Sequence, residues 1–283
     1  MLTRIITGLV AIGLFIPVCI FSYTIAFPIV VGILCLIGVY EMSKCLGFDK
    51  KLLITIPMYI VAFGLPILRY FTGRNTPFLA CAVVAFFGIL IYVLVYVMLK
   101  KNTIKLSEIL TLYAVFVYVV GCFSSMVVIR YSNASLGVGG TGVDGKYVYL
   151  LAFLGAWVCD TFAYFVGRFL GKHKLIPEIS PKKTIEGSIG GILFTIGGFA
   201  LYGLIVNSAF NQNISYIKLC VLGLVLSVVS QIGDLVASSI KRQYDIKDYG
   251  KLFPGHGGVL DRFDSVMLTA PTLYVINIIF GLF

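Results

Sequence analysis

Charged residues are scarce in this sequence. Only 12% of the 283 residues are Asp, Glu, Lys or Arg, whereas 59% are hydrophobic. Soluble globular domains carry about 25% charged residues. The composition therefore excludes an ordinary soluble domain.

Paired cysteines are missing as well. The seven cysteines are scattered, mostly within apolar segments, and no two of them form a Cys-x-x-Cys pair. This distribution argues against a disulfide framework and against a zinc site. We interpret the cysteines as small core residues.

Long apolar runs are what the sequence has in abundance. Each is long enough to cross the roughly 30 Å hydrocarbon core of a bilayer as a helix. The runs are continuous rather than alternating, which favours helices over a barrel. We expect an all-α, polytopic integral membrane protein with about nine transmembrane helices, in the runs 2–20, 23–40, 52–70, 78–99, 109–129, 148–169, 189–207, 217–240 and 264–283. The first run lacks a small-residue cleavage site, so we expect it to be a retained helix rather than a signal peptide.

The positive charges predict the orientation. If the N-terminus is cytoplasmic, 17 of the 22 Lys and Arg fall on the cytoplasmic side. Cytoplasmic loops normally carry such an excess. We therefore predict a cytoplasmic N-terminus and an external C-terminus, and the net charge of +10 requires no nucleic-acid partner. The external residues would be Arg69, Arg74, Arg130, Lys146 and Lys218.

Polar residues within the apolar runs are concentrated in the second half of the chain. We expect an N-terminal transmembrane scaffold of about five helices at 1–130 and a Gly/Ser-rich external loop at 131–147. A second transmembrane region of about four helices, 148–283, should hold the candidate catalytic residues.

Two of the later apolar runs contain a carboxylate. Asp160 lies inside one run, where a charge costs roughly 2.5–3.5 kcal/mol, so it should face a partner or a wet cavity. Arg168 lies two turns further on, roughly on the same face. Asp234, Ser238 and Lys241 form one stripe of a later helix. Each carboxylate could be structural, hydrogen-bonded within the bundle, or could bind a cation.

A pair of lysines precedes the seventh run. Lys182 and Lys183 follow a Ser-Pro turn, and Thr184 could cap the following helix. A helix N-terminus beside two lysines suits a phosphate. Lysine pairs next to a membrane also anchor to lipid headgroups, so the pattern alone leaves both interpretations open.

The segment 238–264 gathers charge: it holds five of the 22 Lys and Arg and four of the 12 acids. Within it, Pro254-Gly255-His256-Gly257-Gly258 forms a glycine-rich turn. Such a turn can direct several backbone N–H groups at an anion. His256 could act as a general acid or base, donate to a phosphate, or be structural.

Asp261 and Asp264 follow this turn at i and i+3 on the predicted start of the last helix, so they should share one face. Together with Asp234 they could bind Mg²⁺, which takes one or two carboxylates and completes its shell with water and substrate phosphates. The alternative is a favourable interaction with the helix dipole alone, worth about 0.3–1 kcal/mol. Arg262, between them, would face a phosphate or an ion-pair partner.

Three patterns resemble signatures of the phosphatidate cytidylyltransferase (CDP-diacylglycerol synthase) family. The longest is Ser238-x-Ile240-Lys241-Arg242-x4-Lys247-Asp248-x-Gly250-x2-Phe253-Pro254-x-His256-Gly257-Gly258-Val259-x-Asp261-Arg262-Phe263-Asp264. The others are Trp157-x2-Asp160-x2-Ala163-Tyr164-x2-Gly167-Arg168 and Ser180-Pro181-Lys182-Lys183-Thr184-x-Glu186-Gly187. These patterns cover about 160–264, and the N-terminal half is similar only in its hydrophobic layout. One position departs: Ala237 stands where family members often have a Glu, which is therefore absent as a metal ligand.

The resemblance implies transfer of CMP from CTP to phosphatidate, giving CDP-diacylglycerol and pyrophosphate, with Mg²⁺ and a second monovalent or divalent cation as a further expectation. On this basis we expect metal binding by Asp234, Asp261 and Asp264, and catalysis by these three with His256, Lys241 and Arg242. The substrate-binding residues implied are Asp160, Arg168, Lys182, Lys183, Ser238, Lys247, Asp248, Gly257, Gly258 and Arg262. The resemblance also implies contact with membrane lipids, a homodimer, and a bacterial plasma membrane with the site facing the cytoplasm.

Two other functional classes fit parts of the sequence. An ion-coupled transporter would use the intramembrane Asp residues as cation sites, but the inverted repeats typical of that class are not evident. A CTP-dependent lipid kinase or another lipid-phosphate transferase would share much of the site. The closely spaced Asp series of CDP-alcohol transferases is absent.

Overall fold

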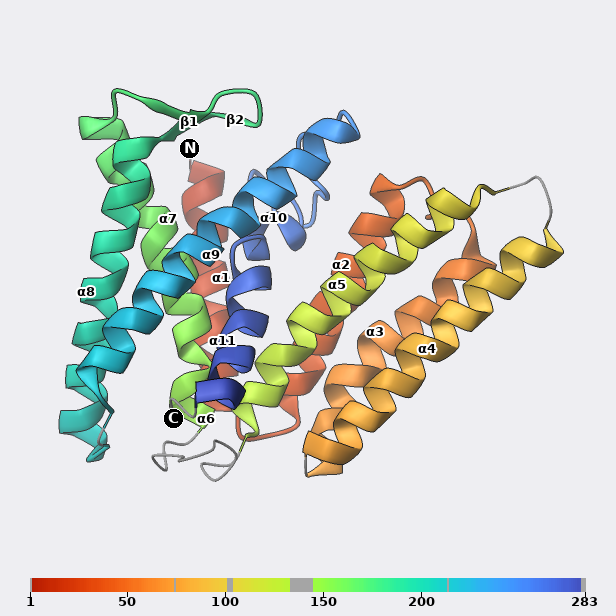
Figure 1. Ribbon diagram of the computed structural model, residues 1–283, viewed down its shortest axis with the longest axis horizontal. Coiled ribbons are helices and arrows are strands. Elements are labelled where there is room, and N and C mark those ends of the chain that lie inside the picture. Colours follow the sequence, from red (N-terminus) through yellow and green to blue (C-terminus); the bar gives the residue numbers. More distant parts are fainter. Residues whose placement is uncertain (1, 74, 101–103, 133–144, 213, 281–283) are drawn as a thin grey trace. The chain divides into compact units, whose positions relative to one another are not determined.

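The computed structural model describes residues 2–73, 75–100, 104–132, 145–212 and 214–280 (Figure 1). Most of the expected Gly/Ser-rich loop, 133–144, lies outside these residues. The end of that loop, 145–147, lies in the short helix α6 (Gly145–Val148).

Each of the nine predicted apolar runs coincides with a helix in the described residues. These are α1 (Leu2–Ile20), α2 (Ala26–Cys45), α3 (Leu52–Thr72), α4 (Asn75–Leu99), α5 (Leu106–Arg130), α7 (Leu150–Leu170), α8 (Ile185–Phe210), α9 (Tyr216–Gln243) and α11 (Val266–Phe280). Within the described parts of the chain, seven helices are long and apolar enough to cross a bilayer, and Val266–Ile279 is a shorter apolar helix. The all-α membrane class is confirmed, while the number of spans and the orientation stay predictions.

The chain forms two compact units. Unit 1 comprises Met1–Tyr131 and Ile246–Arg262, and unit 2 comprises Ser132–Asp245 and Phe263–Phe283. The charged segment 238–264 is therefore divided. Its glycine-rich middle folds with the N-terminal helices, whereas its two ends fold with the other unit.

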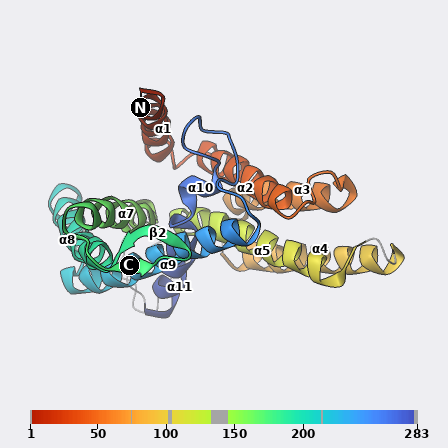
Figure 2. The ribbon, with the colours of Figure 1, turned by 90° about the horizontal axis from the view of Figure 1, so that it is seen from above.

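Unit 1 is built on helix pairs. α2 packs against α3 and α5, and α4 packs against α3 and α5. Viewed from above, α2 with α3 and α5 with α4 form two rows (Figure 2). Two buried arginines link its helices. The Arg69 guanidinium of α3 donates to the carbonyl of Tyr131, just after α5, at 2.6 Å, and Arg130 Nε of α5 donates to Ser22 Oγ at 2.8 Å.

Unit 2 is a bundle in which α7 lies along α8, and α9 and α11 pack on α7 and on each other. Glycines permit the close approach of α7 and α8. A Cβ added at Gly187 would lie 2.6 Å from the Ala163 carbonyl oxygen, and one at Gly191 would lie 2.9 Å from the Cys159 carbonyl oxygen. Small residues allow such backbone contact between membrane helices.

A short antiparallel hairpin joins α7 to α8, which the sequence did not predict. It consists of β1 (Lys174–Ile176) and β2 (Ser180–Thr184), with Lys174 opposite Thr184. The predicted cap of α8 is confirmed. The Thr184 side chain accepts a hydrogen bond from the Gly187 N–H at 3.1 Å.

The expected continuous helix carrying both Asp261 and Asp264 is wrong. A four-residue helix, α10 (Leu260–Phe263), ends before Asp264, and a turn at Asp264 and Ser265 separates it from α11. Asp264 Oδ1 accepts from the Ser265 N–H at 2.9 Å. Such a side-chain hydrogen bond offers the backbone an alternative to the helical pattern, and this interrupts the helix.

Candidate active site

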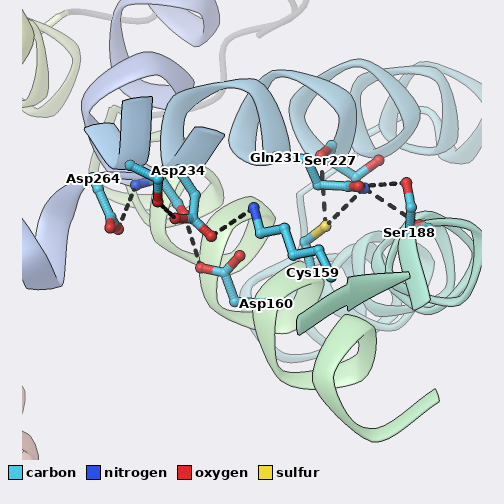
Figure 3. Close-up of polar contacts among 10 residues, drawn as sticks. Cys159, Asp160, Ser188, Ser227, Gln231, Asp234 and Asp264 are labelled. Atoms are coloured by element: carbon cyan, nitrogen blue, oxygen red, sulfur yellow. Dashed lines mark hydrogen bonds and ion pairs between the residues drawn. The ribbon is translucent and has the colours of Figure 1, made fainter. Parts of the chain in front are cut away.

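Three carboxylates gather in unit 2, and we call Asp160, Asp234 and Asp264 the carboxylate cluster. They come from α7, from α9 and from the turn before α11. Figure 3 shows the three side chains close together beside the crossing of α7 and α9. The sequence predicted each residue as a candidate, and the structure brings these three together.

Serine and lysine side chains hold the cluster. Ser265 joins two members, since its hydroxyl donates to Asp160 Oδ2 at 2.8 Å and its N–H donates to Asp264. Lys183 Nζ, on β2, lies 2.7 Å from Asp234 Oδ2. Ser238 donates to Asp234 Oδ1 at 3.3 Å, as expected for the i, i+4 stripe. A strand lysine, a helix serine and a turn serine thus orient the carboxylates.

Asp264, which lies in the turn outside the helices, holds a proton more readily than an exposed aspartate, as its raised pKa shows. Burial, followed by repulsion from the Asp234 carboxylate, raises the pKa of Asp264 to about 7. Asp160 adds to this repulsion, and Lys241 opposes it. A nearby divalent cation would relieve the repulsion and favour the ionised form.

The donor set fits a magnesium ion of the substrate-sharing kind. No group of three His, Cys, Asp or Glu side chains in the described segments is arranged to hold a metal ion by itself. Mg²⁺ does not require one, because it usually binds one or two carboxylates and completes its octahedron with water and substrate phosphates. Asp234 and Asp264 can supply those carboxylates.

A row of polar contacts lies to one side of the cluster and connects three helices (Figure 3). Gln231 on α9 donates to Cys159 Sγ at 3.4 Å and to the Ser188 carbonyl at 3.3 Å. The Ser188 hydroxyl donates back to the Gln231 side-chain oxygen. These contacts fix α7, α8 and α9 beside the carboxylates.

The hairpin of β1 and β2 carries one lysine that is held by an ion pair and one that is exposed. Lys183 is only 25% exposed and pairs with Asp234, whereas Lys182 is exposed. The Glu186 carboxylate accepts from the N–H groups of Lys172 and His173 and lies 2.6 Å from His173 Nδ1, which closes the base of the hairpin.

The remaining predicted cations of unit 2 lie nearer the surface. Arg168 is exposed and donates to the Tyr164 hydroxyl at 3.0 Å. Arg242 is exposed at the end of α9, and Lys241 is half-buried. Ala237, at the position where a Glu was expected from the resemblance, is buried with 8% exposure.

Unit 1 holds the other predicted residues in a segment that we call the Gly-rich loop, residues 246–262. Its turn is closed by the Phe253 N–H, which donates to the Gly257 carbonyl at 2.9 Å, and by the His256 N–H, which donates to the Phe253 carbonyl at 2.9 Å. Gly255 and Gly257 adopt φ values of +75° and +85°, which favour glycine.

Residues of this loop line an open pocket of about 660 Å³. Its charged side chains Lys247, Asp248, Lys251 and Arg262 are exposed. His256 also lines it, and His256 Nδ1 is a buried atom without a hydrogen-bond partner in the described residues. The loop therefore offers three cations and an imidazole to an anionic ligand.

The backbone N–H groups of residues 258–260 have protein partners. Asp261 Oδ2 accepts from Gly258 N at 2.9 Å and from Tyr249 N at 2.8 Å, and Asp261 is 7% exposed. The N–H groups of Val259 and Leu260 donate to Glu41. The N–H groups of residues 258–260 thus gather around two carboxylates of the protein itself, and binding of an anionic ligand by this turn stays a prediction. Metal binding by Asp261 and substrate binding by Gly257 and Gly258 stay predictions.

Besides Ser265 at the carboxylate cluster, sequence reasoning missed Glu41. It lies near the end of α2, just after the run expected at 23–40, and looked like an ordinary charge at a helix end. The structure instead buries it, with 3% exposure. A single acid in a 20-residue apolar helix was the available signal, but nothing local identified its partners.

Comparison with known proteins agrees with these features. A family model described as the cytidylyltransferase family matches residues 2–280. A phosphatidate cytidylyltransferase of Bacillus subtilis is 39% identical over 70% of this chain and 68% of its own length. Proteins of that name from Staphylococcus aureus and Staphylococcus saprophyticus are 34% and 31% identical, each over 98% of this chain and 99% of their own. The chain belongs to the cytidylyltransferase family.

Proposed function

We propose that this protein transfers CMP from CTP to phosphatidate, producing CDP-diacylglycerol and pyrophosphate for phospholipid synthesis. The observation that carries the proposal is the shared name of relatives that align over 98% of the chain. The clustering of Asp160, Asp234 and Asp264 beside Lys183 supports it, since phosphoryl chemistry requires charge neutralisation.

In this reaction, a phosphate oxygen of phosphatidate attacks the α-phosphorus of CTP. The bond from the α-phosphorus to the oxygen that bridges it to the β-phosphorus breaks, and pyrophosphate leaves with that oxygen. A phosphate monoester is already anionic, so little base catalysis is needed. The contribution of the protein is to position two anionic substrates and to balance their charge.

In unit 2, Asp234 and Asp264 would hold Mg²⁺, with Asp160 orienting the Asp264 segment through Ser265. Bound magnesium supplies charge neutralisation at phosphate oxygens. Lys183 balances the Asp234 carboxylate. Lys182, next to it in the chain, and Arg168, in the last turn of α7, are exposed and suited to CTP phosphates.

The remaining cations serve the lipid phosphate or the transition state. Lys241 and Arg242 end α9, and His256, Lys247 and Arg262 line the open pocket of the Gly-rich loop. Arginine and lysine at such positions favour phosphate ligands. Metal binding by Asp261 remains part of the proposal, although one of its oxygens already accepts two backbone hydrogen bonds.

The cellular setting is proposed from the sequence. The excess of Lys and Arg on one side supports a site that faces the cytoplasm. Bacterial relatives support location in the plasma membrane. A homodimer is proposed from the family resemblance alone, and chemical cross-linking in native membranes tests it.

The proposed reaction is tested with purified protein in detergent, CTP labelled at the α-phosphate, phosphatidate and Mg²⁺. Label should enter a lipid that co-migrates with CDP-diacylglycerol, and chelation of Mg²⁺ should stop it. Folded protein that incorporates no label would refute the proposal. A parallel reaction with γ-labelled CTP and diacylglycerol distinguishes this activity from that of a lipid kinase. Only a kinase would transfer the labelled γ-phosphate to the lipid.

A further inference from the structure

A buried glutamate of a membrane helix contacts the Gly-rich loop within unit 1. Glu41 Oε1 accepts from the Val259 N–H at 2.9 Å, and Oε2 accepts from the Leu260 N–H at 2.9 Å. Both carboxylate oxygens are therefore engaged by the backbone. Since Glu41 is only 3% exposed, it does not reach a substrate directly.

The two N–H groups belong to the start of α10. The first N–H groups of a helix lack partners inside the helix, and a negative charge beside them is favourable. Glu41 thus caps α10 from a different helix, more than 200 residues earlier in the chain.

Two glycines make this contact possible. A Cβ added at Gly250 or at Gly258 would collide with the Glu41 carboxylate. The loop backbone closes over the carboxylate at both positions, which any larger residue would prevent. The requirement for glycine at these positions follows from Glu41 and needs no bound phosphate.

A second carboxylate fixes the same loop from within. Asp261 accepts from the N–H groups of Tyr249 and Gly258. Residues 249–260 are therefore held by two carboxylates, and between the anchored ends lie the turn at 253–257 and His256. The anchors fix where His256 and Arg262 line the open pocket.

We propose that Glu41 is a positioning residue for CMP transfer, which holds the Gly-rich loop so that its cations and His256 meet the anionic substrates. This rests on the proposed function. It gives the N-terminal helices a role in the reaction, because α2 carries the anchor for the loop.

The test replaces the carboxylate with its neutral isostere. In Glu41→Gln, the amide NH₂ group faces a backbone N–H that has lost its acceptor. Glu108→Gln is the matched control, because Glu108 is an exposed acid of the same unit. We measure KM and kcat for CTP and phosphatidate, and tryptic cleavage after Lys247 and Lys251, which are exposed in the loop.

Glu41→Gln should raise the KM for at least one substrate by roughly tenfold and speed loop cleavage by a similar factor, as expected for one lost charge-assisted hydrogen bond. A merely structural role would lower the amount of folded enzyme, hence the maximal rate, without changing KM. Unchanged KM together with unchanged loop cleavage would overturn the proposal, and so would a change that Glu108→Gln reproduces.

Two further arms keep the outcome decisive. If Glu41→Gln does not fold, Gly250→Ala displaces the carboxylate instead and should give the same rise in KM and cleavage; wild-type values there would also refute the proposal. If folded wild-type protein labels no lipid, the proposed function fails, while the cleavage rates still decide whether Glu41 anchors the loop.

Discussion

Single residues of the carboxylate cluster differ in what they can contribute. Asp160 and Asp264 are linked through Ser265, whereas Asp234 pairs with the cation Lys183. Asp234 is also the stronger of the two carboxylates that repel Asp264. Removing its charge should therefore disturb the site more than its exposure of 27% suggests.

We predict that Asp234→Asn lowers the rate of CMP transfer by about 100-fold to 1000-fold, the range for loss of a preorganised electrostatic group. The substitution preserves size but removes the charge that faces Lys183 and a bound cation. Incorporation of α-label into lipid measures it. Asp245→Asn is the control, because Asp245 is exposed in the same unit and Asn tolerates its positive φ. Near wild-type activity of Asp234→Asn would remove Asp234 from the metal site.

The two adjacent lysines should separate into different kinetic effects. Lys183→Met leaves the half-buried Asp234 without its cation, so it should lower kcat by roughly tenfold or more. Lys182→Met removes an exposed cation and should mainly raise the KM for CTP, with a smaller effect in high salt. Steady-state kinetics at two salt concentrations distinguish them. Equal effects of the two substitutions would contradict the assignment of separate roles.

At the level of elements, local sequence patterns predicted the features that depend on local interactions. Continuous apolar runs located the helices, and the Thr184 cap was read from its position before α8. The hairpin was missed because β1 has only three residues and a lysine-rich setting. The break between α10 and α11 depends on the Asp264 side chain, which competes with the helical pattern in a way that spacing does not reveal.

The packing of α7 on α8 supports a prediction about thermal stability. Gly187→Ala places a Cβ 2.6 Å from the Ala163 carbonyl oxygen and 2.9 Å from the capping Thr184 Oγ1. Overpacking of this kind costs about 1–3 kcal/mol, so the thermal unfolding temperature in detergent should fall. Gly197→Ala, on the same helix, meets nothing within 4 Å and should be neutral or slightly stabilising. Equal unfolding temperatures for the two variants would show that this contact does not limit the separation of the helices.

At the scale of the whole molecule, the sequence could not reveal which of the two compact units each polar segment joins. The charged segment appeared as one site, yet residues 246–262 fold with the N-terminal helices. One contact within this unit joins Glu41 to Val259, 218 positions further along the chain. Contacts at such separations depend on tertiary packing, so hydropathy and spacing cannot predict them.

Orientation in the membrane is the last property that the charge pattern predicts for the whole chain. If Lys and Arg set a cytoplasmic N-terminus, Lys247 and Lys251 lie on the cytoplasmic side. Trypsin added to sealed inside-out vesicles should then cut the Gly-rich loop, while right-side-out vesicles should protect it until they are permeabilised. Replacing both lysines with Gln removes the fragments and identifies the cleavage site. CTP is a cytoplasmic nucleotide, so cleavage confined to right-side-out vesicles would contradict both the orientation and access of the loop to its proposed substrate.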